Sequence, residues 1–62
     1  MDEIKIGSVV TFIRDYRLYT VIELFETIYK IKKANIKDNE TGDVVNDILL
    51  SELELAPAGA RL

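Results

Sequence analysis

The sequence predicts an all-β domain of about five short strands, and three observations lead to this prediction. Short runs rich in β-branched and aromatic residues alternate with polar breaks along the chain. Residues 38–43 carry the residue types of a tight turn. Residues 52–55 alternate between Glu and Leu, which is the period of a half-buried strand. We therefore expect a single small domain over residues 1–55.

The first two predicted strands flank a charged break. One runs over residues 4–13, with Gly7 as a bend, and residues 14–17 then form a loop. The second covers residues 18–25, whose sequence LYTVIELF has a strong β composition. Alternation divides it into one face with Thr20, Ile22 and Leu24 and another with Tyr19, Val21, Glu23 and Phe25. Both faces carry apolar groups, as in a strand shared between the two halves of a small barrel.

The third predicted strand runs over residues 28–37, after a turn at Glu26 and Thr27. Its apolar residues change parity, because Tyr29 and Ile31 are odd-numbered whereas Ala34 and Ile36 are even-numbered. Strict alternation would leave one of these pairs in water. A β-bulge near Lys32 and Lys33 would restore both pairs to one face and bend the strand.

The rest of the chain reads as a turn, a return strand and a closing strand. Gly42 suits the positive φ that a hairpin turn over residues 38–43 requires. Val44 and Val45 begin the return strand, and residues 46–51 contain a short helical turn. Residues 52–55 form the last strand with Leu53 and Leu55 facing inward, and residues 56–62 are expected to be a disordered tail.

A helix around residues 16–33 is the alternative, which would give an α+β fold. Six apolar residues would share one helix face: Leu18, Val21, Ile22, Phe25, Ile28 and Tyr29. Asp15 would cap this helix, and the lysines near residue 32 suit its C-terminal end. The β-branched residues of this region lower helix propensity, so strands remain the favoured prediction.

Composition excludes several kinds of chemistry. The chain has no Cys and no His, so it has neither disulfides nor a zinc-finger or thiolate site. Ser8 and Ser51 have no recognisable catalytic partner, and we expect no enzymatic activity and no cofactor. Residues 38–43 are acidic but lack the spacing of a calcium loop, so no metal site is predicted. With no long apolar stretch and no apolar signal region, we expect a cytoplasmic protein.

The order of these elements resembles an SH3-like small β-barrel of the KOW/Tudor type. The resemblance covers residues 4–55 and is carried by the Gly7-Ser8-Val9-Val10 opening, the Thr41-Gly42-Asp43-Val44-Val45 turn and the closing Leu53-Glu54-Leu55. It implies a barrel with a short helical turn before its last strand. Such barrels bind nucleic acid, peptides or methylated side chains, or serve as structural modules. The Trp on which SH3 peptide grooves usually rely is absent.

Charge is unevenly distributed, and this suggests two functions. Residues 14–37 hold six basic and three acidic residues, a net charge of +3, whereas residues 38–62 hold six acidic residues and Arg61, a net charge of −5. Oppositely charged segments favour association with a protein partner or a second copy, and a small core without staples favours it further. We therefore expect a non-enzymatic protein-interaction or self-associating module.

Nucleic-acid binding is the second hypothesis. It uses a basic stripe with two aromatic residues for base stacking, and the same residues are the candidates for partner contact. These candidates are Arg14, Tyr16, Arg17, Tyr19, Lys30, Lys32 and Lys33. The acidic total charge of −3 argues against this hypothesis, because nucleic-acid-binding domains tend to be basic.

Overall fold

A computed structural model describes residues 3–57 and contains five β-strands and one short 3₁₀-helix. The described residues include no α-helix, so the all-β prediction is confirmed. The elements are β1 (Val9–Phe12), β2 (Leu18–Glu26), β3 (Lys32–Asp38), β4 (Val44–Leu49), η1 (Leu50–Glu52) and β5 (Leu53–Leu55).

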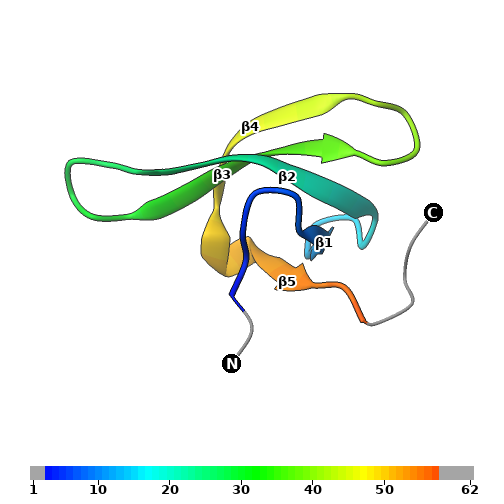
Figure 1. The fold of residues 1–62 in the computed structure, drawn as a ribbon, viewed down its shortest axis with the longest axis horizontal. Coiled ribbons are helices and arrows are strands. Elements are labelled where there is room, and N and C mark those ends of the chain that lie inside the picture. The colour runs from blue at the N-terminus through cyan, green and yellow to red at the C-terminus, as the bar shows by residue number, and fades with distance from the viewer. Residues whose placement is uncertain (1–2, 58–62) are drawn as a thin grey trace.

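The strands form one antiparallel sheet in the order β4-β3-β2-β1-β5. The first four strands follow one another as hairpins, and η1 then leads the chain back so that β5 pairs with β1 (Figure 1). β4 and β5 are the two edges, and no pairing joins them within residues 3–57. The sheet is therefore curled but not closed.

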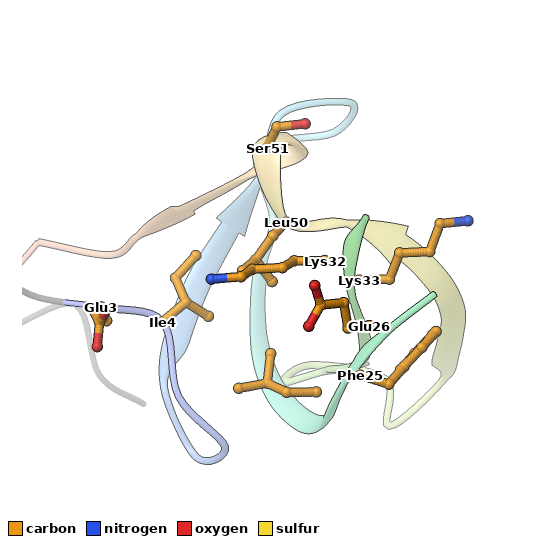
Figure 2. Close-up of a pocket in the computed structure, with 9 residues that line it drawn as sticks. Glu3, Ile4, Phe25, Glu26, Lys32, Lys33, Leu50 and Ser51 are labelled. Carbon is orange, nitrogen blue, oxygen red and sulfur yellow. The ribbon is translucent and has the colours of Figure 1, made fainter. Parts of the chain in front are cut away.

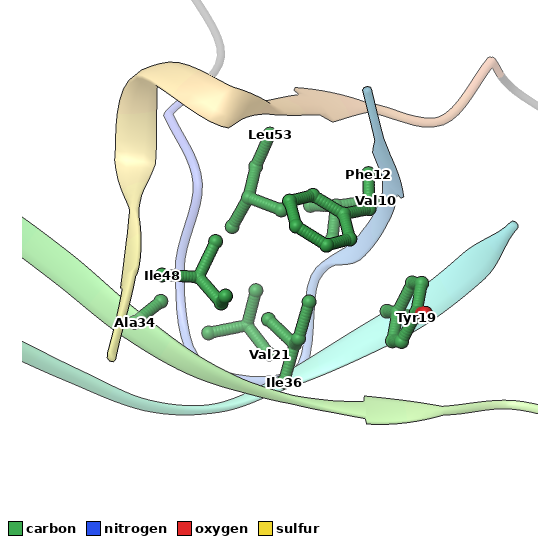
Figure 3. Close-up of a cluster of buried hydrophobic side chains, with 8 residues drawn as sticks. All are labelled: Val10, Phe12, Tyr19, Val21, Ala34, Ile36, Ile48 and Leu53. Atoms are coloured by element: carbon green, nitrogen blue, oxygen red, sulfur yellow. The ribbon is translucent and has the colours of Figure 1, made fainter. Parts of the chain in front are cut away.

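Each strand contributes to a single hydrophobic core. Figure 3 shows these side chains between β5 and η1 on one side and β2 and β3 on the other. Alternating residues of β1, of β3 and of β2 as far as Val21 point inward, as a sheet with one buried face requires, whereas β4 and β5 each bury one residue. The core consists of Val10, Phe12, Tyr19, Val21, Ala34, Ile36, Ile48 and Leu53.

Gly7 bends the chain as predicted, but the first strand is shorter than residues 4–13. Gly7 has a φ of 92°, a left-handed conformation that glycine adopts without a Cβ clash. Its N–H donates to the Val21 carbonyl at 2.7 Å, and the Val21 N–H donates to the Ser8 carbonyl at 2.9 Å. Ile6 and Gly7 form a turn, so the regular strand begins only at Val9.

The predicted turn at residues 38–43 is confirmed, and Asp38 organises it. Its Oδ1 accepts the backbone N–H groups of Glu40 at 2.7 Å and Thr41 at 3.1 Å. Gly42, with a φ of 82°, donates its N–H to the Asp38 carbonyl at 2.9 Å. The side chain of Asp38 thus stabilises the turn that its position in the sequence begins.

The predicted bulge near Lys32 and Lys33 is wrong. Both residues pair regularly with Glu26 and Phe25, and Tyr29 and Ile31 lie in the β2–β3 turn, where no inward face is required of them. The parity conflict therefore came from placing turn residues in a strand. The expected faces of β2 hold only to Val21, because its pairing with β3 shifts register between Val21 and Glu23.

The helix around residues 16–33 is also wrong. This region forms β2 and the start of β3, and Leu18 to Thr20 pair with β1 while Tyr19 to Glu26 pair with β3. The β-branched and aromatic residues pack well on a pleated surface, and two flanking strands satisfy the backbone groups that a helix would satisfy internally.

The C-terminal elements differ slightly from the prediction. Strand β4 continues to Leu49, and the helical turn comes later, as η1. Leu53 is buried, but Leu55 is 37% exposed although it shares its face. The Ala56 N–H extends the pairing by donating to the Val9 carbonyl at 2.9 Å. Of the tail predicted over residues 56–62, residues 58–62 lie outside the described part of the chain.

Candidate interaction surface

The candidate basic residues do not form one stripe, because β2 separates them. Arg14 and Arg17 lie in the loop before β2, whereas Lys30, Lys32 and Lys33 lie in and after the turn that follows it (Figure 1). A strand of nine residues spans about 25–30 Å at about 3.3 Å per residue. The two groups therefore occupy opposite ends of the β2–β3 hairpin.

Arg17 belongs to a structural network. Its Nε donates to Asp38 Oδ2 at 2.9 Å and its Nη2 to Glu40 Oε2 at 3.3 Å. The backbone N–H of Glu40 has the largest effect in holding the pKa of the Asp38 carboxyl below its usual range. The side chain of Arg17 and the backbone N–H of Thr41 act in the same direction. The hydrogen bond to Asp38 in turn raises the pKa of Arg17. This arginine anchors the β3–β4 turn against the start of β2.

The two candidate stacking residues have different positions. Tyr19 is 4% exposed, meets Phe12 edge-on at 5.9 Å between ring centroids, and donates its hydroxyl to Asp15 Oδ2 at 2.6 Å. This hydrogen bond and burial raise the pKa of Tyr19 to about 12. Its ring has no free face for a base. Tyr16 is 77% exposed, at a φ of 58° in the loop.

Two further basic candidates also have acidic partners. Arg14 Nη2 lies 3.1 Å from Glu52 Oε2, with its guanidinium carbon 5.6 Å from the centre of the Phe12 ring. Lys33 Nζ lies 3.0 Å from Asp47 Oδ1. Every ion pair within residues 3–57 joins a base from residues 14–37 to an acid from residues 38–62. The basic middle segment and the acidic C-terminal segment of the chain thus neutralise part of each other's charge within the fold.

Among residues 3–57, the largest concentration of exposed apolar side chains lies at the end of the β2–β3 hairpin. We call this end, residues 22–33, the hairpin arm. Ile28 is 89% exposed, Tyr29 79%, Ile31 44% and Phe25 40%. Figure 1 shows the arm extending away from β1 and β5. A backbone hydrogen bond closes the turn: the Thr27 N–H donates to the Ile31 carbonyl at 3.0 Å. Exposed apolar residues that gather in one place mark interaction sites.

A groove of about 660 Å³ lies at the base of this arm, and we call it the arm groove. Its apolar walls come from Ile4, Leu24, Phe25 and Leu50, and Figure 2 shows Lys32 reaching across toward Ile4. The remaining lining residues are charged or polar: Glu3, Glu26, Lys33 and Ser51. Apolar residues surrounded by polar and charged residues are the usual arrangement of a protein-contact surface.

Sequence reasoning missed the arm and the groove. The signal is the parity conflict at Tyr29 and Ile31, from which the sequence analysis predicts a bulge. The alternative, that both residues lie outside the strand and face solvent, produces the same pattern of letters. Three of the predicted contact residues belong to this region. Lys30 lies in the turn of the arm, Lys32 and Lys33 line the groove, and Lys33 also forms an ion pair with Asp47.

Residues 3–57 were also compared with what a catalytic serine, a metal site or a membrane span requires. Ser8 Oγ accepts the Lys5 backbone N–H at 2.9 Å, which is a turn contact. Residues 3–57 include no cluster of three metal-ligating side chains. They also include no helix with the length and apolar character needed to span a membrane.

Comparison of the chain with protein-family models, curated proteins and solved structures gave no match in any of the three.

Proposed function

We propose that this protein is a non-enzymatic interaction module that binds a protein partner or a second copy through the hairpin arm and the arm groove. One observation carries the proposal: Ile28 and Tyr29, two large apolar residues at the tip of the arm, are 89% and 79% exposed. Placing such side chains in water costs free energy that burial against a partner recovers, about 25 cal/mol per Å² of apolar area. No catalytic group is needed for this role.

Further support comes from the size of the core. Eight buried apolar residues hold the described part of the chain together, and domains of about 60 residues bury only about 60% of their unfolded surface. Association adds stability to such a protein. The small chain has no cysteine, unlike disulfide-stapled secreted domains, and this supports a cytoplasmic location.

The architecture fits an incompletely closed SH3-like small barrel, and this assignment is part of the proposal. Its support is the sequence of hairpins, the 3₁₀ turn before the last strand, and the pairing of that strand with the first. The arm, which carries the proposed contact surface, is the second of the three hairpins.

Paired tyrosine variants test this function. Tyr29 and Tyr16 are 79% and 77% exposed and lie at opposite ends of β2. Asn is tolerated in loops and at positive φ, so Tyr29→Asn and Tyr16→Asn should both fold. We expect Tyr29→Asn to weaken self-association, or binding of an identified partner, by about tenfold, the loss of about 1.4 kcal/mol. Tyr16→Asn should bind like the wild type.

Equal effects of the two variants, or no effect of Tyr29→Asn, would refute the arm as the contact surface. A separate NMR titration tests nucleic-acid binding. Titration with mixed DNA and RNA oligonucleotides at low and high salt should leave the amide spectrum unmoved, because Arg14, Arg17 and Lys33 already have acidic partners. Salt-sensitive shifts centred on Lys30 and Lys32 would favour the nucleic-acid hypothesis instead.

A further inference from the structure

The outer edge of β2 is open from Ile22 to Glu26. β1 pairs with β2 only as far as Thr20, and Gly7 and Ser8 add bonds to Val21. Before Gly7, Glu3 and Ile4 line the same groove as this edge, but no segment of residues 3–57 pairs with the rest of it. The arm groove lies along the same stretch, since Leu24, Phe25 and Glu26 line it.

Backbone groups of two residues point out of this edge. The Thr27 N–H donates to the Ile31 carbonyl, so Thr27 faces β3. Because strand residues alternate in direction, Phe25 and Glu23 also bond toward β3, whereas Leu24 and Glu26 direct their N–H and C=O groups away from it. These four groups have no described protein partner and can form two hydrogen-bonded residue pairs with another strand.

This edge differs from the two ends of the sheet because its exposed apolar side chains are grouped. Edges are commonly blunted by bulges, charges or shortness. β4 carries a bulge at Asn46 and Asp47, with Asp47 at a φ of 65°, and β5 is three residues long. The open edge of β2 also begins at a register shift and carries two glutamates, but it exposes Ile22, Leu24 and Phe25 by 37–40% each within four residues. The exposed large apolar residues of β4 and β5 are fewer and more widely spaced: Val44, Leu49 and Leu55.

We propose that this edge pairs with the same edge of a second copy, antiparallel and across a two-fold axis at Phe25. The inference rests on the proposed function and names its partner. In this register Leu24 faces Glu26 of the second copy, and the two exchange both backbone hydrogen bonds. The two Phe25 residues form the non-hydrogen-bonded pair, where side chains are closest and aromatic pairs stabilise a sheet. Ile28 comes beside Ile22 of the other copy.

Area supports a second copy as the occupant, and the charge of the arm permits it. Residues 22–33 contain two acidic and three basic residues, a net charge of +1, so two arms repel each other weakly although the whole chain carries −3. At about 200 Å² for a buried aromatic side chain, the exposed parts of Tyr29 and Phe25 supply about 240 Å² per copy. The isoleucines and the groove floor add a comparable area, which brings the total to about 1,000 Å², the threshold for a specific interface.

Glu26 allows a backbone test. Glu26→Pro removes an N–H that points away from β3, so the β2–β3 bonds remain, and Phe25 already has the extended conformation that precedes proline. Glu26→Ala is the control, since it removes the same side chain and keeps the N–H. Phe25→Glu places like charges opposite each other across the axis while facing Lys33 within its own chain. Dispersed amide spectra would verify that all three variants fold.

Sedimentation equilibrium of the full chain measures the result. We expect the wild type to move from 7.1 kDa to twice that mass with rising concentration. Glu26→Pro and Phe25→Glu should weaken the dimer by about tenfold or more, and Glu26→Ala by less than about threefold. Hydrogen exchange at the Leu24 and Glu26 amides should slow as the dimer forms.

Three outcomes would overturn strand pairing. A wild type that stays monomeric at every concentration removes the second copy, and the partner-binding assay with Tyr29→Asn then decides the proposed function separately. A dimer that tolerates Glu26→Pro but is weakened by Tyr29→Asn uses the arm without the β2 edge. Growth beyond a dimer would indicate open-ended stacking in place of a two-fold pair.

Discussion

The side-chain oxygen of Asn35 accepts the backbone N–H of Asp47 at 2.9 Å. Asp47 lies in the β4 bulge, where two residues oppose one residue of β3. The amide nitrogen of the same Asn35 donates to Glu23 Oε1 at 2.6 Å, next to the register shift in β2. One side chain in β3 therefore links both bulges, and these are the places where the sheet bends.

Removing this link should destabilise the fold. Asn35→Ala removes both hydrogen bonds, and water can reach the freed Asp47 N–H and Glu23 carboxylate because both bonds are exposed. We therefore expect a loss of about 0.5–1.5 kcal/mol in the free energy of unfolding. Urea unfolding followed by circular dichroism measures it. Glu23→Gln keeps an acceptor for the Asn35 amide and should change stability by less than about 0.5 kcal/mol. A larger loss in Glu23→Gln than in Asn35→Ala would contradict the linking role.

The lowered pKa of Asp38 predicts a dependence of stability on acid. A depressed carboxyl pKa contributes stability that is present above the unfolded value of about 4 and is lost as the pH falls through the lower folded value. Asp38→Asn should therefore lower the urea midpoint at neutral pH, and its difference from the wild type should shrink below about pH 4.

Glu40→Gln is the control for Asp38, because Glu40 contacts the same Arg17 from an exposed position. Its urea midpoint should lie closer to that of the wild type, since exposed ion pairs contribute about 0–1 kcal/mol. A constant difference between Asp38→Asn and the wild type from pH 7 to pH 2 would show that the Asp38 charge does not stabilise the turn.

Tyr19 predicts a change at the opposite end of the pH scale. Its folded pKa of about 12 lies above the unfolded value of about 10, so the stability that it contributes is lost as the pH rises from about 10 through 12. Tyr19→Phe should remove the most alkaline step in the tyrosinate absorbance titration. It should also cost about 1 kcal/mol through the lost Asp15 hydrogen bond. Retention of that step would assign it to another tyrosine.

Lys30 offers a stabilising substitution on the arm. It occupies a φ of 62° in the β2–β3 turn, which costs a residue with a Cβ about 1–2 kcal/mol. Lys30→Gly removes this cost and adds about 0.5–1 kcal/mol of backbone entropy loss, so a net gain of about 0.5–1 kcal/mol is expected. Thermal unfolding should show it, with Lys30→Ala giving no gain. A destabilised Lys30→Gly would contradict the turn geometry.

Local chemistry was sufficient for much of this fold. The β composition of residues 18–25, the bend at Gly7 and the turn around Gly42 follow from side-chain branching and backbone freedom, which act within a few residues. Leu53 could be placed in the core from alternation alone. The positions of the bulges could not be predicted in this way, because a register shift depends on how two strands pair and not on the residues of one strand.

By itself the sequence determined that the chain is all-β, where most of its turns lie, and that it lacks cysteine and histidine chemistry. Only the tertiary structure decided which charges and which apolar groups remain available. Antiparallel pairing placed Arg14 and Lys33 beside acids distant in sequence, and it carried Ile28 and Tyr29 beyond the core into solvent. The reason is physical: composition sets what a side chain can do, whereas exposure and pairing depend on strands that meet only after folding.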